Sequence, residues 1–321
     1  MAGELLLLGT AGAPLPVAGR AGICSAVLVD GRVFLVDCGR GAPSGYVDAG
    51  LNFRALEAVF VTHLHVDHVG DLPGMILYPW GVRGGLPPLR VYGPSRPRAL
   101  PQGDADFRRE TTIHPELPAP GVSDLVRDIL TANAYHLNVM PLDAHMPDPG
   151  GLVRAMDVAA PDWAPDGTQR PVPVYRDDTV EVTAIAVMHG RAVPALAYRF
   201  DTADGSVAFS GDTAASDDLI ELARGADVLV HQVADLDYLR QHGFDAAELA
   251  RMAELHTDVS EVGDVAERAG VRELVLTHFL PADPAAVSTA DWARRASPAF
   301  SGRTIVGYDG LRRPMSPGRL P

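Results

Sequence analysis

Short apolar runs separated by turn residues alternate with helical patterns along the chain. The first runs cover 4–8, 26–37, 58–62 and 89–93, and the second is interrupted at Asp30-Gly31. Runs of this length bounded by turn chemistry are typical of buried strands. Further strands are expected at 179–188, 195–200, 206–210, 227–230 and 273–277, and helices at 216–224, 245–254 and 260–269. The pattern predicts an α/β protein.

The interval 94–175 has a different character. Prolines recur in it, and only 121–138 has a helical period, with Ser123 as the expected N-cap. A long interval without regular structure inside a compact domain is usually functional or disordered. We therefore expect one domain spanning 1–321, with a partly helical, lid-like insertion at about 94–175 that covers the active site.

Composition indicates the class of protein and its cellular compartment. The 321 residues are 47% hydrophobic and 21% charged, as in a soluble globular protein with a large core. No apolar run reaches the ~20 residues of a membrane helix, so no membrane partner is expected. The first residues lack the features of a secretory signal, which favours the cytoplasm. Cys24 and Cys38 are too few for a disulfide framework and are expected to be small buried hydrophobes.

The charge balance is acidic. The formal net charge is −14, and all 27 basic residues are arginine. Proteins that grip nucleic acid usually carry a basic stripe. The short groups Arg108-Arg109, Arg294-Arg295 and Arg312-Arg313 are expected to be solvated surface instead. The charge thus favours a small-molecule substrate and disfavours nucleic acid, and a symmetric homodimer is the expected assembly.

The segment from His63 to His68 holds the strongest chemical signal. It places His63, His65, Asp67 and His68 directly after the apolar run 58–62. Neutral imidazole is a good zinc ligand and a carboxylate suits a harder or bridging role, so a tight loop can aim two pairs at neighbouring points. Three further residues end apolar runs in the same way: His189, Asp212 and His278. Together they predict a metal site.

These motifs resemble the metallo-β-lactamase-fold hydrolase superfamily, in its arylsulfatase-like and RNase Z-like branch. The resemblance rests on 35–39 (Leu-Val-Asp-Cys-Gly), the His63–His68 segment, His189, 210–213 (Ser-Gly-Asp-Thr) and 277–278. It covers nearly the whole chain. It implies a four-layer αβ/βα sandwich with two metal ions at one edge of two facing sheets. Asp at 212, where true β-lactamases have a thiol, separates the chain from them.

The resemblance also implies a role for each residue. It assigns one metal ion to His63, His65 and His189, and the other to Asp67, His68 and His278. Asp212 would bridge the two ions, and Asp37 would hold the loop that carries the ligands. Zinc is the expected metal, although manganese or iron can use the same ligands. Such a pair of ions binds a hydroxide at neutral pH, so no protein nucleophile is required.

Asp67 and His256 are the expected catalytic residues. His256 lies in a segment, 255–260 (Leu-His-Thr-Asp-Val-Ser), that is similar to one in RNase Z and arylsulfatase-like members. It is expected to donate a hydrogen bond or proton to the developing anion, the alternative being a surface histidine at a helix end. His231-Gln232 resembles a His-Glu pair of the same relatives, but Gln replaces the acid, so a structural role is expected. His136 is a candidate for the pocket wall.

Three functions follow from these features. The main one is a dinuclear hydrolase of a small ester, such as a sulfate ester, phosphodiester or lactone. The alternative is an RNase Z-type tRNA 3′-processing endonuclease, which shares the metal set and the His256 segment but conflicts with the acidic charge. The third is a non-hydrolytic member of the fold. The complete ligand set argues against that last function.

Overall fold

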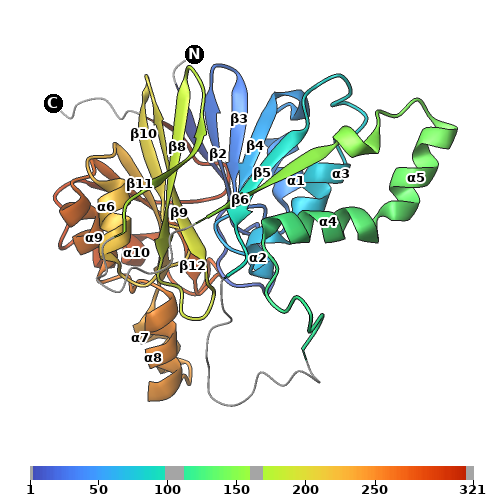
Figure 1. The fold of residues 1–321 in the computed structure, drawn as a ribbon. Coiled ribbons are helices and arrows are strands. Elements are labelled where there is room, and N and C mark those ends of the chain that lie inside the picture. Colours follow the sequence, from blue (N-terminus) through green and yellow to red (C-terminus); the bar gives the residue numbers. More distant parts are fainter. Residues whose placement is uncertain (1–2, 98–111, 160–168, 316–321) are drawn as a thin grey trace.

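Two facing β-sheets form the body of the protein, which a computed structural model describes over residues 3–97, 112–159 and 169–315 (Figure 1). Each sheet has seven strands. In order of hydrogen-bonded neighbours, sheet A consists of β14 (Arg312–Pro314), β1 (Glu4–Gly9), β2 (Cys24–Val29), β3 (Arg32–Val36), β4 (Leu56–Phe60), β5 (Leu89–Pro94) and β6 (Val153–Val158). Sheet B consists of β13 (Arg303–Val306), β12 (Glu273–Leu280), β11 (Val228–Ala234), β10 (Gly205–Phe209), β9 (Ala195–Thr202), β8 (Val180–Val187) and β7 (Val172–Arg176).

Strand direction follows one scheme in both sheets. In sheet A the strands from β14 to β3 are antiparallel, and those from β3 to β6 are parallel. In sheet B the strands from β7 to β10 are antiparallel, and those from β10 to β13 are parallel. Strands that run in the same direction end at the same edge of a sheet. The carboxyl ends of β8, β10 and β12 therefore lie together, where open α/β sheets usually form their sites.

Both faces of the central strands of each sheet are buried. The inner faces share one apolar core that contains a group of aromatic rings, in which the Phe60 ring lies 5.1 Å from that of Phe200 and 5.4 Å from that of Tyr198. The outer faces pack against helices, as shown by strand β12, where Val275 belongs to the inner core and Leu274 to an outer one. Strands buried on both faces appear in a sequence as continuous apolar runs.

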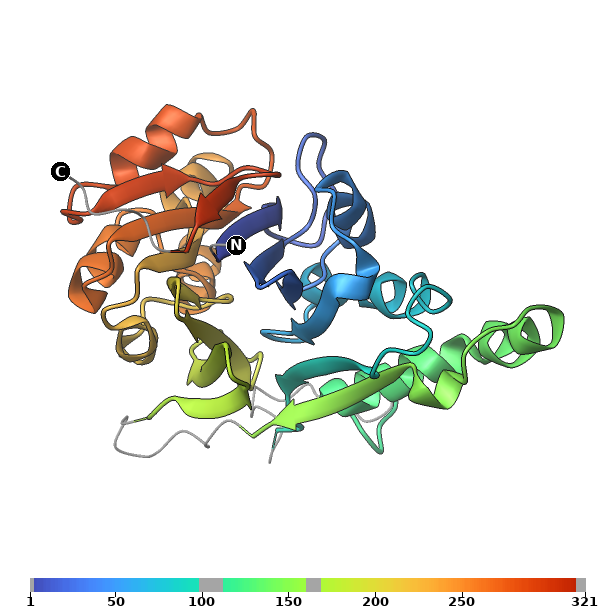
Figure 2. The same ribbon diagram turned by 90° about the horizontal axis from the view of Figure 1, so that it is seen from above.

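Helices cover the outer face of each sheet. Sheet A is covered by α1 (Ala42–Asp48), α3 (Leu72–Leu77) and α4 (Val122–Ala132), and sheet B by α6 (Asp217–Ala223), α9 (Val262–Ala269) and α10 (Thr289–Ala296). Figure 2 shows the two sheets side by side with helices outside them. The predicted four-layer αβ/βα sandwich is confirmed. No helix among the described residues is long and apolar enough to cross a membrane.

The described residues form four further helices. They are α2 (Val66–Val69), α5 (Ala134–Asp143), α7 (Leu236–Gln241) and α8 (Ala246–Leu255), with single 3₁₀ turns at Phe53–Ala55 and Pro149–Gly151. Helix α5 extends away from the sheets, and α7 and α8 project together beyond the edge of sheet B (Figure 1). The interruption expected at Asp30-Gly31 is confirmed as the turn between β2 and β3, where both residues have positive φ.

The prediction for 94–175 needs correction. Strands β6 and β7 lie within this interval and extend sheets A and B, so these parts are not an insertion. Their few alternating residues between prolines gave no clear strand signal. The expected helix at 121–138 is divided into α4 and α5 at Asn133. Residues 98–111 and 160–168 lie outside the described residues, and the lid function of the interval stays a prediction.

The predicted N-cap of this helix is also wrong. Helix α4 begins at Val122, so Ser123 lies inside it and Gly121 is the N-cap. The Asp124 carboxylate accepts a hydrogen bond from the Gly121 N–H at 3.0 Å. A side chain at 121 would place its Cβ 2.7 Å from the backbone nitrogen of Arg96. The close approach of these two chain segments therefore decides the helix start, and it leaves no trace in local sequence.

Hydrogen bonds join the two sheets at the edge that carries the His63 segment. The buried Tyr198 hydroxyl of β9 donates to the carbonyl of Val61 at 2.9 Å. Two residues earlier on β9, the Leu196 N–H donates to the Thr62 carbonyl at 2.9 Å. Burial raises the pKa of Tyr198, so this hydroxyl keeps its proton. Sheet B thereby fixes the two residues that precede His63.

Replacing Tyr198 tests how much this hydrogen bond contributes to the stability of the fold. Tyr198→Phe leaves the buried Val61 carbonyl without its donor, so we expect the free energy of unfolding to fall by about 1–3 kcal/mol. Chemical denaturation measures the change. Tyr135→Phe is the matched control, because Tyr135 on α5 is 82% exposed. Equal stability of the two variants would contradict the structural role of the Tyr198 hydroxyl.

Candidate metal centre

A buried carboxylate positions the loop after β4. Asp37, which is 2% exposed, follows β3 and has a φ of 62°. Its Oδ1 accepts from the Thr62 N–H at 2.8 Å, and its Oδ2 accepts from the Thr62 hydroxyl at 2.9 Å and from His68 Nδ1 at 2.8 Å. The last bond leaves His68 Nε2 facing His278 and Asp212 of the other sheet. This is the holding role that the resemblance implied for Asp37.

Three histidines from the two sheets form the first group. His63 and His65 come from the loop after β4, and His189 follows β8. His65 Nδ1 and His189 Nε2 lie 3.3 Å apart. Each of the three rings offers one nitrogen, and these nitrogens lie within 4.8 Å of one another. His189 Nδ1 donates to the Leu255 carbonyl at 2.7 Å, which leaves its Nε2 with a lone pair. This arrangement is that of a three-imidazole metal site.

A second group lies beside the first. Asp67, His68 and His278 each offer one donor atom to it. The Nε2 atoms of His68 and His278 lie 3.2 Å apart, and Asp67 Oδ2 lies 3.5 Å from His278 Nε2. His278 has a φ of 46°, and the loop at Gly12 packs against its ring so closely that a Cβ there would meet Nδ1 at 2.8 Å. The close approach of the Gly12 loop therefore limits the orientation of the His278 ring.

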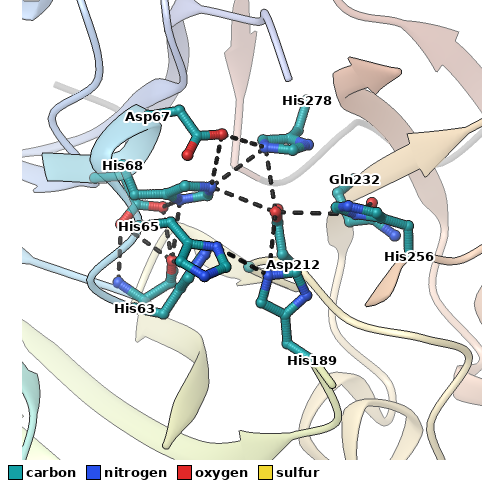
Figure 3. A network of polar contacts seen from close by, with 12 residues as sticks. His63, His65, Asp67, His68, His189, Asp212, Gln232, His256 and His278 are labelled. Carbon is teal, nitrogen blue, oxygen red and sulfur yellow. Dashed lines mark hydrogen bonds and ion pairs between the residues drawn. The ribbon is translucent and has the colours of Figure 1, made fainter. Parts of the chain in front are cut away.

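Asp212 lies between the two groups, directly after β10 and the Ser210-Gly211 turn. Its Oδ2 is 3.3 Å from His278 Nε2, 3.5 Å from His68 Nε2 and 3.8 Å from His189 Nε2. Figure 3 shows these side chains pointing toward one another around the carboxylate. One carboxylate that reaches both groups is the geometry of a bridging ligand. The structure thus brings together all the residues that the sequence predicted as ligands.

Unpartnered donor atoms test whether a metal fits. His63 Nε2 and Asp212 Oδ1 are buried and have no hydrogen-bond partner among the described residues. The Thr62 hydroxyl gives its proton to Asp37, so it accepts from His63 Nδ1 at 3.1 Å, and His63 Nε2 carries a lone pair. Buried polar atoms without partners are costly. Divalent cations would satisfy both atoms, so the donor set fits a pair of metal ions.

Protonation states agree with this fit. Burial lowers the pKa of His63, His65 and His189, so all three favour the neutral form, which is the form of imidazole that can bind a metal ion. Burial would raise the pKa of Asp212, but the neighbouring His278 and His68 hold it well below its usual value. Burial likewise opposes the charge of His68, yet Asp212 and Asp37 raise its pKa. Because His68 Nδ1 donates to Asp37, the second proton of a charged His68 would be on Nε2, where a metal cation could replace it.

His256 adjoins the cluster at the end of α8. Its Nδ1 donates to Gln232 Oε1 at 2.9 Å and lies 3.9 Å from Asp212 Oδ2. Gln232 Nε2 donates to the Thr213 carbonyl at 2.9 Å, which fixes the amide with its oxygen toward His256. Sequence reasoning missed Gln232 as the partner of His256, because 24 residues separate them and only the adjacency of β11 to the loop before α9 joins them.

The other candidates lie elsewhere. His231 is fully buried on the opposite face of β11 from Gln232, and neither ring nitrogen has a partner among the described residues. Burial lowers its pKa to about 4, so it is a neutral core residue. His136 contacts the Trp80 ring at 5.7 Å, in the layer outside sheet A. Neither residue belongs to the metal-ligand groups.

Comparisons with known proteins extend the evidence. The model of the "Metallo-beta-lactamase superfamily" matches residues 19–259. Ribonuclease Z of Mycobacterium sp. (strain KMS) is 34% identical over 316 residues, which cover 98% of this chain and 97% of the relative. Ribonuclease Z of Mycobacterium bovis is 30% identical over 319 residues, covering 98% and 99%.

Solved structures show the same fold. The metallo-beta-lactamase fold protein YhfI from Bacillus subtilis has a TM-score of 0.63 at 20% identity, covering 98% of this chain and 99% of that one. The short form of human tRNase Z has a TM-score of 0.61 at 18% identity, covering 97% and 98%. At these identities the likeness concerns the fold alone.

The relatives overturn one expectation from composition. The acidic charge was expected to make nucleic acid a disfavoured partner, but the two relatives above, which match nearly the whole chain, are both named Ribonuclease Z. The expectation is therefore wrong, because net charge says nothing about the local field at a metal centre. The metal-dependent hydrolase class is confirmed. The chain belongs to the metallo-beta-lactamase superfamily.

Proposed function

We propose that this protein is a zinc-dependent ribonuclease of the RNase Z type, which hydrolyses a phosphodiester bond at the 3′ side of a precursor tRNA. The geometry that carries the proposal is the pair of ligand groups that share Asp212. It is the arrangement that two-metal phosphodiester hydrolysis requires. The ribonucleases Z that align along 98% of the chain support the choice of RNA over a small ester.

The residues of each group have separate duties in this proposal. His63, His65 and His189 would hold one cation, and Asp67, His68 and His278 the other, with Asp212 shared. Two bound cations would lower the pKa of a water to roughly 7 and neutralise charge on the phosphate. Asp37 and the Leu255 carbonyl would fix the rings of His68 and His189, so that the donor atoms need no rearrangement on binding.

His256 is the proposed proton donor. Burial lowers its pKa to about 4, so His256 is neutral in the free site, with its Nδ1 proton engaged by Gln232. A phosphodiester anion beside the ring would favour the protonated form. His256 would then donate to the oxygen that becomes anionic as the bond breaks. Asp67, whose pKa is lowered by its histidine neighbours against the effect of burial, would stay ionised and accept a proton from the nucleophilic water.

Donor chemistry and the proposed substrate suggest the metal and the compartment. Imidazole with carboxylate is a common zinc set, and manganese or iron would compete for it. Cys24 and Cys38 are free, buried thiols, which agrees with a reducing compartment. We therefore infer zinc as the metal and the cytoplasm as the location.

Chelation tests the metal and the substrate together. Protein treated with a chelator should lose more than about 99% of its cleavage of a precursor tRNA with a 3′ trailer, because no side chain can replace the metals as the source of a nucleophile. Added Zn²⁺ should restore one defined cut, with about two ions per chain by elemental analysis. Undiminished cleavage after verified metal removal would refute the metal role. Metal-loaded protein that hydrolyses aryl sulfates or lactones but no RNA would refute the substrate.

The shared ligand gives a second test. Asp212→Ala should reduce the bound metal from two ions to one or fewer and lower the rate at least about 100-fold, because both sites lose a ligand. Asp178→Ala, at an exposed carboxylate outside the site, should keep both values. Two tightly bound ions in Asp212→Ala would exclude bridging by this residue.

The role of His256 can be tested without disturbing the proposed ligands. His256→Ala should keep two metal ions and lower kcat about 100-fold or more, the usual size of a general acid–base contribution. His242→Ala changes an exposed histidine after α7 and serves as the control. Unchanged turnover of metal-replete His256→Ala would remove this residue from the mechanism.

A further inference from the structure

A pocket opens beside the first ligand group. Its volume is about 260 Å³, and its floor includes His63 and His65. One wall is the turn after His189, with Arg191 and Pro194. The opposite wall consists of described residues before and after 98–111, namely Pro94, Ser95, Pro97, Ala119 and Pro120. A volume just below the ~300 Å³ of the smallest ligand sites suits one group of a substrate and not a whole small molecule.

The turn that carries Arg191 is held on several sides. The Ala192 N–H donates to the His189 carbonyl at 3.0 Å, and the Gly190 N–H donates to the Glu254 carbonyl at 3.2 Å. Gly190 has a φ of 53°, and a Cβ there would lie 2.5 Å from the Leu255 side chain. The backbone of residues 189–192 is therefore fixed by the same α8 segment that orients His189. Arg191 lies at the corner of this fixed turn.

Arg191 is an unpaired cation in an acidic protein. Most described arginines donate to a carboxylate, as Arg32 does to Asp177 and Arg313 to Glu273. Others, such as Arg83, donate to backbone carbonyls. Arg191 forms no hydrogen bond and no ion pair with any residue in the described part of the chain, although it lines a pocket that adjoins the metal ligands. A guanidinium without a protein partner at this position can bind an anion from the substrate.

The other walls are apolar. Proline rings at 94, 97, 120 and 194, together with Ala119 and Val193, provide non-polar surfaces with little conformational freedom. Such walls pack against the face of a base or ribose, while one cation binds the attached phosphate. A nucleotide offers this combination of a flat apolar part and an anion. A lactone carries no anion, and the only anion of an aryl sulfate is the reacting group itself, so neither offers a second anion to this pocket.

We propose that this pocket binds the nucleotide next to the scissile phosphodiester of an RNA substrate, and that Arg191 donates to a phosphate oxygen of that nucleotide. The inference rests on the proposed ribonuclease function and adds a substrate-binding residue to it. Arg191 would favour substrates that carry a phosphate next to the scissile one, and the apolar walls would make the contact tolerant of sequence.

Kinetics of an Arg191 variant on two substrates test the proposal. Arg191→Met keeps the length of the side chain and removes its charge. On a precursor tRNA we expect KM to rise about tenfold and kcat to change much less, because a contact present before and during reaction is lost. Bis(p-nitrophenyl) phosphate has no adjoining nucleotide, so the KM for this substrate should stay about the same. Arg191→Lys should recover part of the loss.

Salt dependence gives an independent readout. A lost phosphate contact should reduce the slope of log KM against log salt by about 0.7, the value for one contact on a single strand. Arg154→Met is the matched control. Arg154 is another exposed arginine without a described partner, and it pairs with Arg90 in the β5–β6 ladder, at the far end from Pro94. The control should keep both the slope and KM, and metal content and thermal midpoint should be equal in all variants.

The outcomes separate the two proposals. If the wild-type protein cuts RNA and Arg191→Met shows the same KM and salt slope, the pocket assignment is wrong and the ribonuclease function stands. Equal effects of Arg191→Met and Arg154→Met would also overturn the assignment, since overall charge would then be the cause. If the metal-loaded wild-type protein cuts no RNA, both proposals fall.

Discussion

The metal centre depends on one buried anion, Asp37. A carboxylate that is 2% exposed must be surrounded by donors, and Asp37 obtains them from Thr62 and His68. These bonds tie the loop after β4 to the end of β3. A second tie follows directly, since the Cys38 N–H donates to the His68 carbonyl at 2.7 Å and the Asp71 N–H to the Cys38 carbonyl at 2.9 Å. Every candidate ligand between 63 and 68 lies in the loop that this junction holds.

The sandwich then brings the second half of the site to the first. Sheet A supplies the loop after β4, whereas His189, Asp212 and His278 come from the ends of β8, β10 and β12 in sheet B. A shift of one sheet relative to the other would change the distances between the two sets of donor atoms, and metal sites tolerate only about 0.2 Å in such distances. The link between Tyr198 and Val61, next to the aromatic core, resists such a shift. Packing far from the metals is thus a condition for binding them.

Local chemistry explains which features could be predicted from the sequence. Apolar runs ending in His or Asp indicated both the strands and the candidate ligands, because a strand end at a sheet edge aims its next side chain toward that edge. The sequence did not reveal β6 and β7, which are short, partly exposed edge strands with weak alternation. It also gave no sign of the bond between Gln232 and His256 or of the unpaired Arg191, since both depend on contacts between distant segments.

The failed inference from net charge has a physical cause. Charges more than about 10 Å apart in water are screened at ordinary ionic strength, so a total of −14 says little about the field at one pocket. The paired arginines illustrate this: Arg295 is held by Asp235 and Arg313 by Glu273, so they are neither free cations nor plain surface. Arg108 and Arg109 lie outside the described residues. Two divalent cations would exceed the charge of Asp67 and Asp212, and the field that a phosphodiester meets would then be positive at the one place where it reacts.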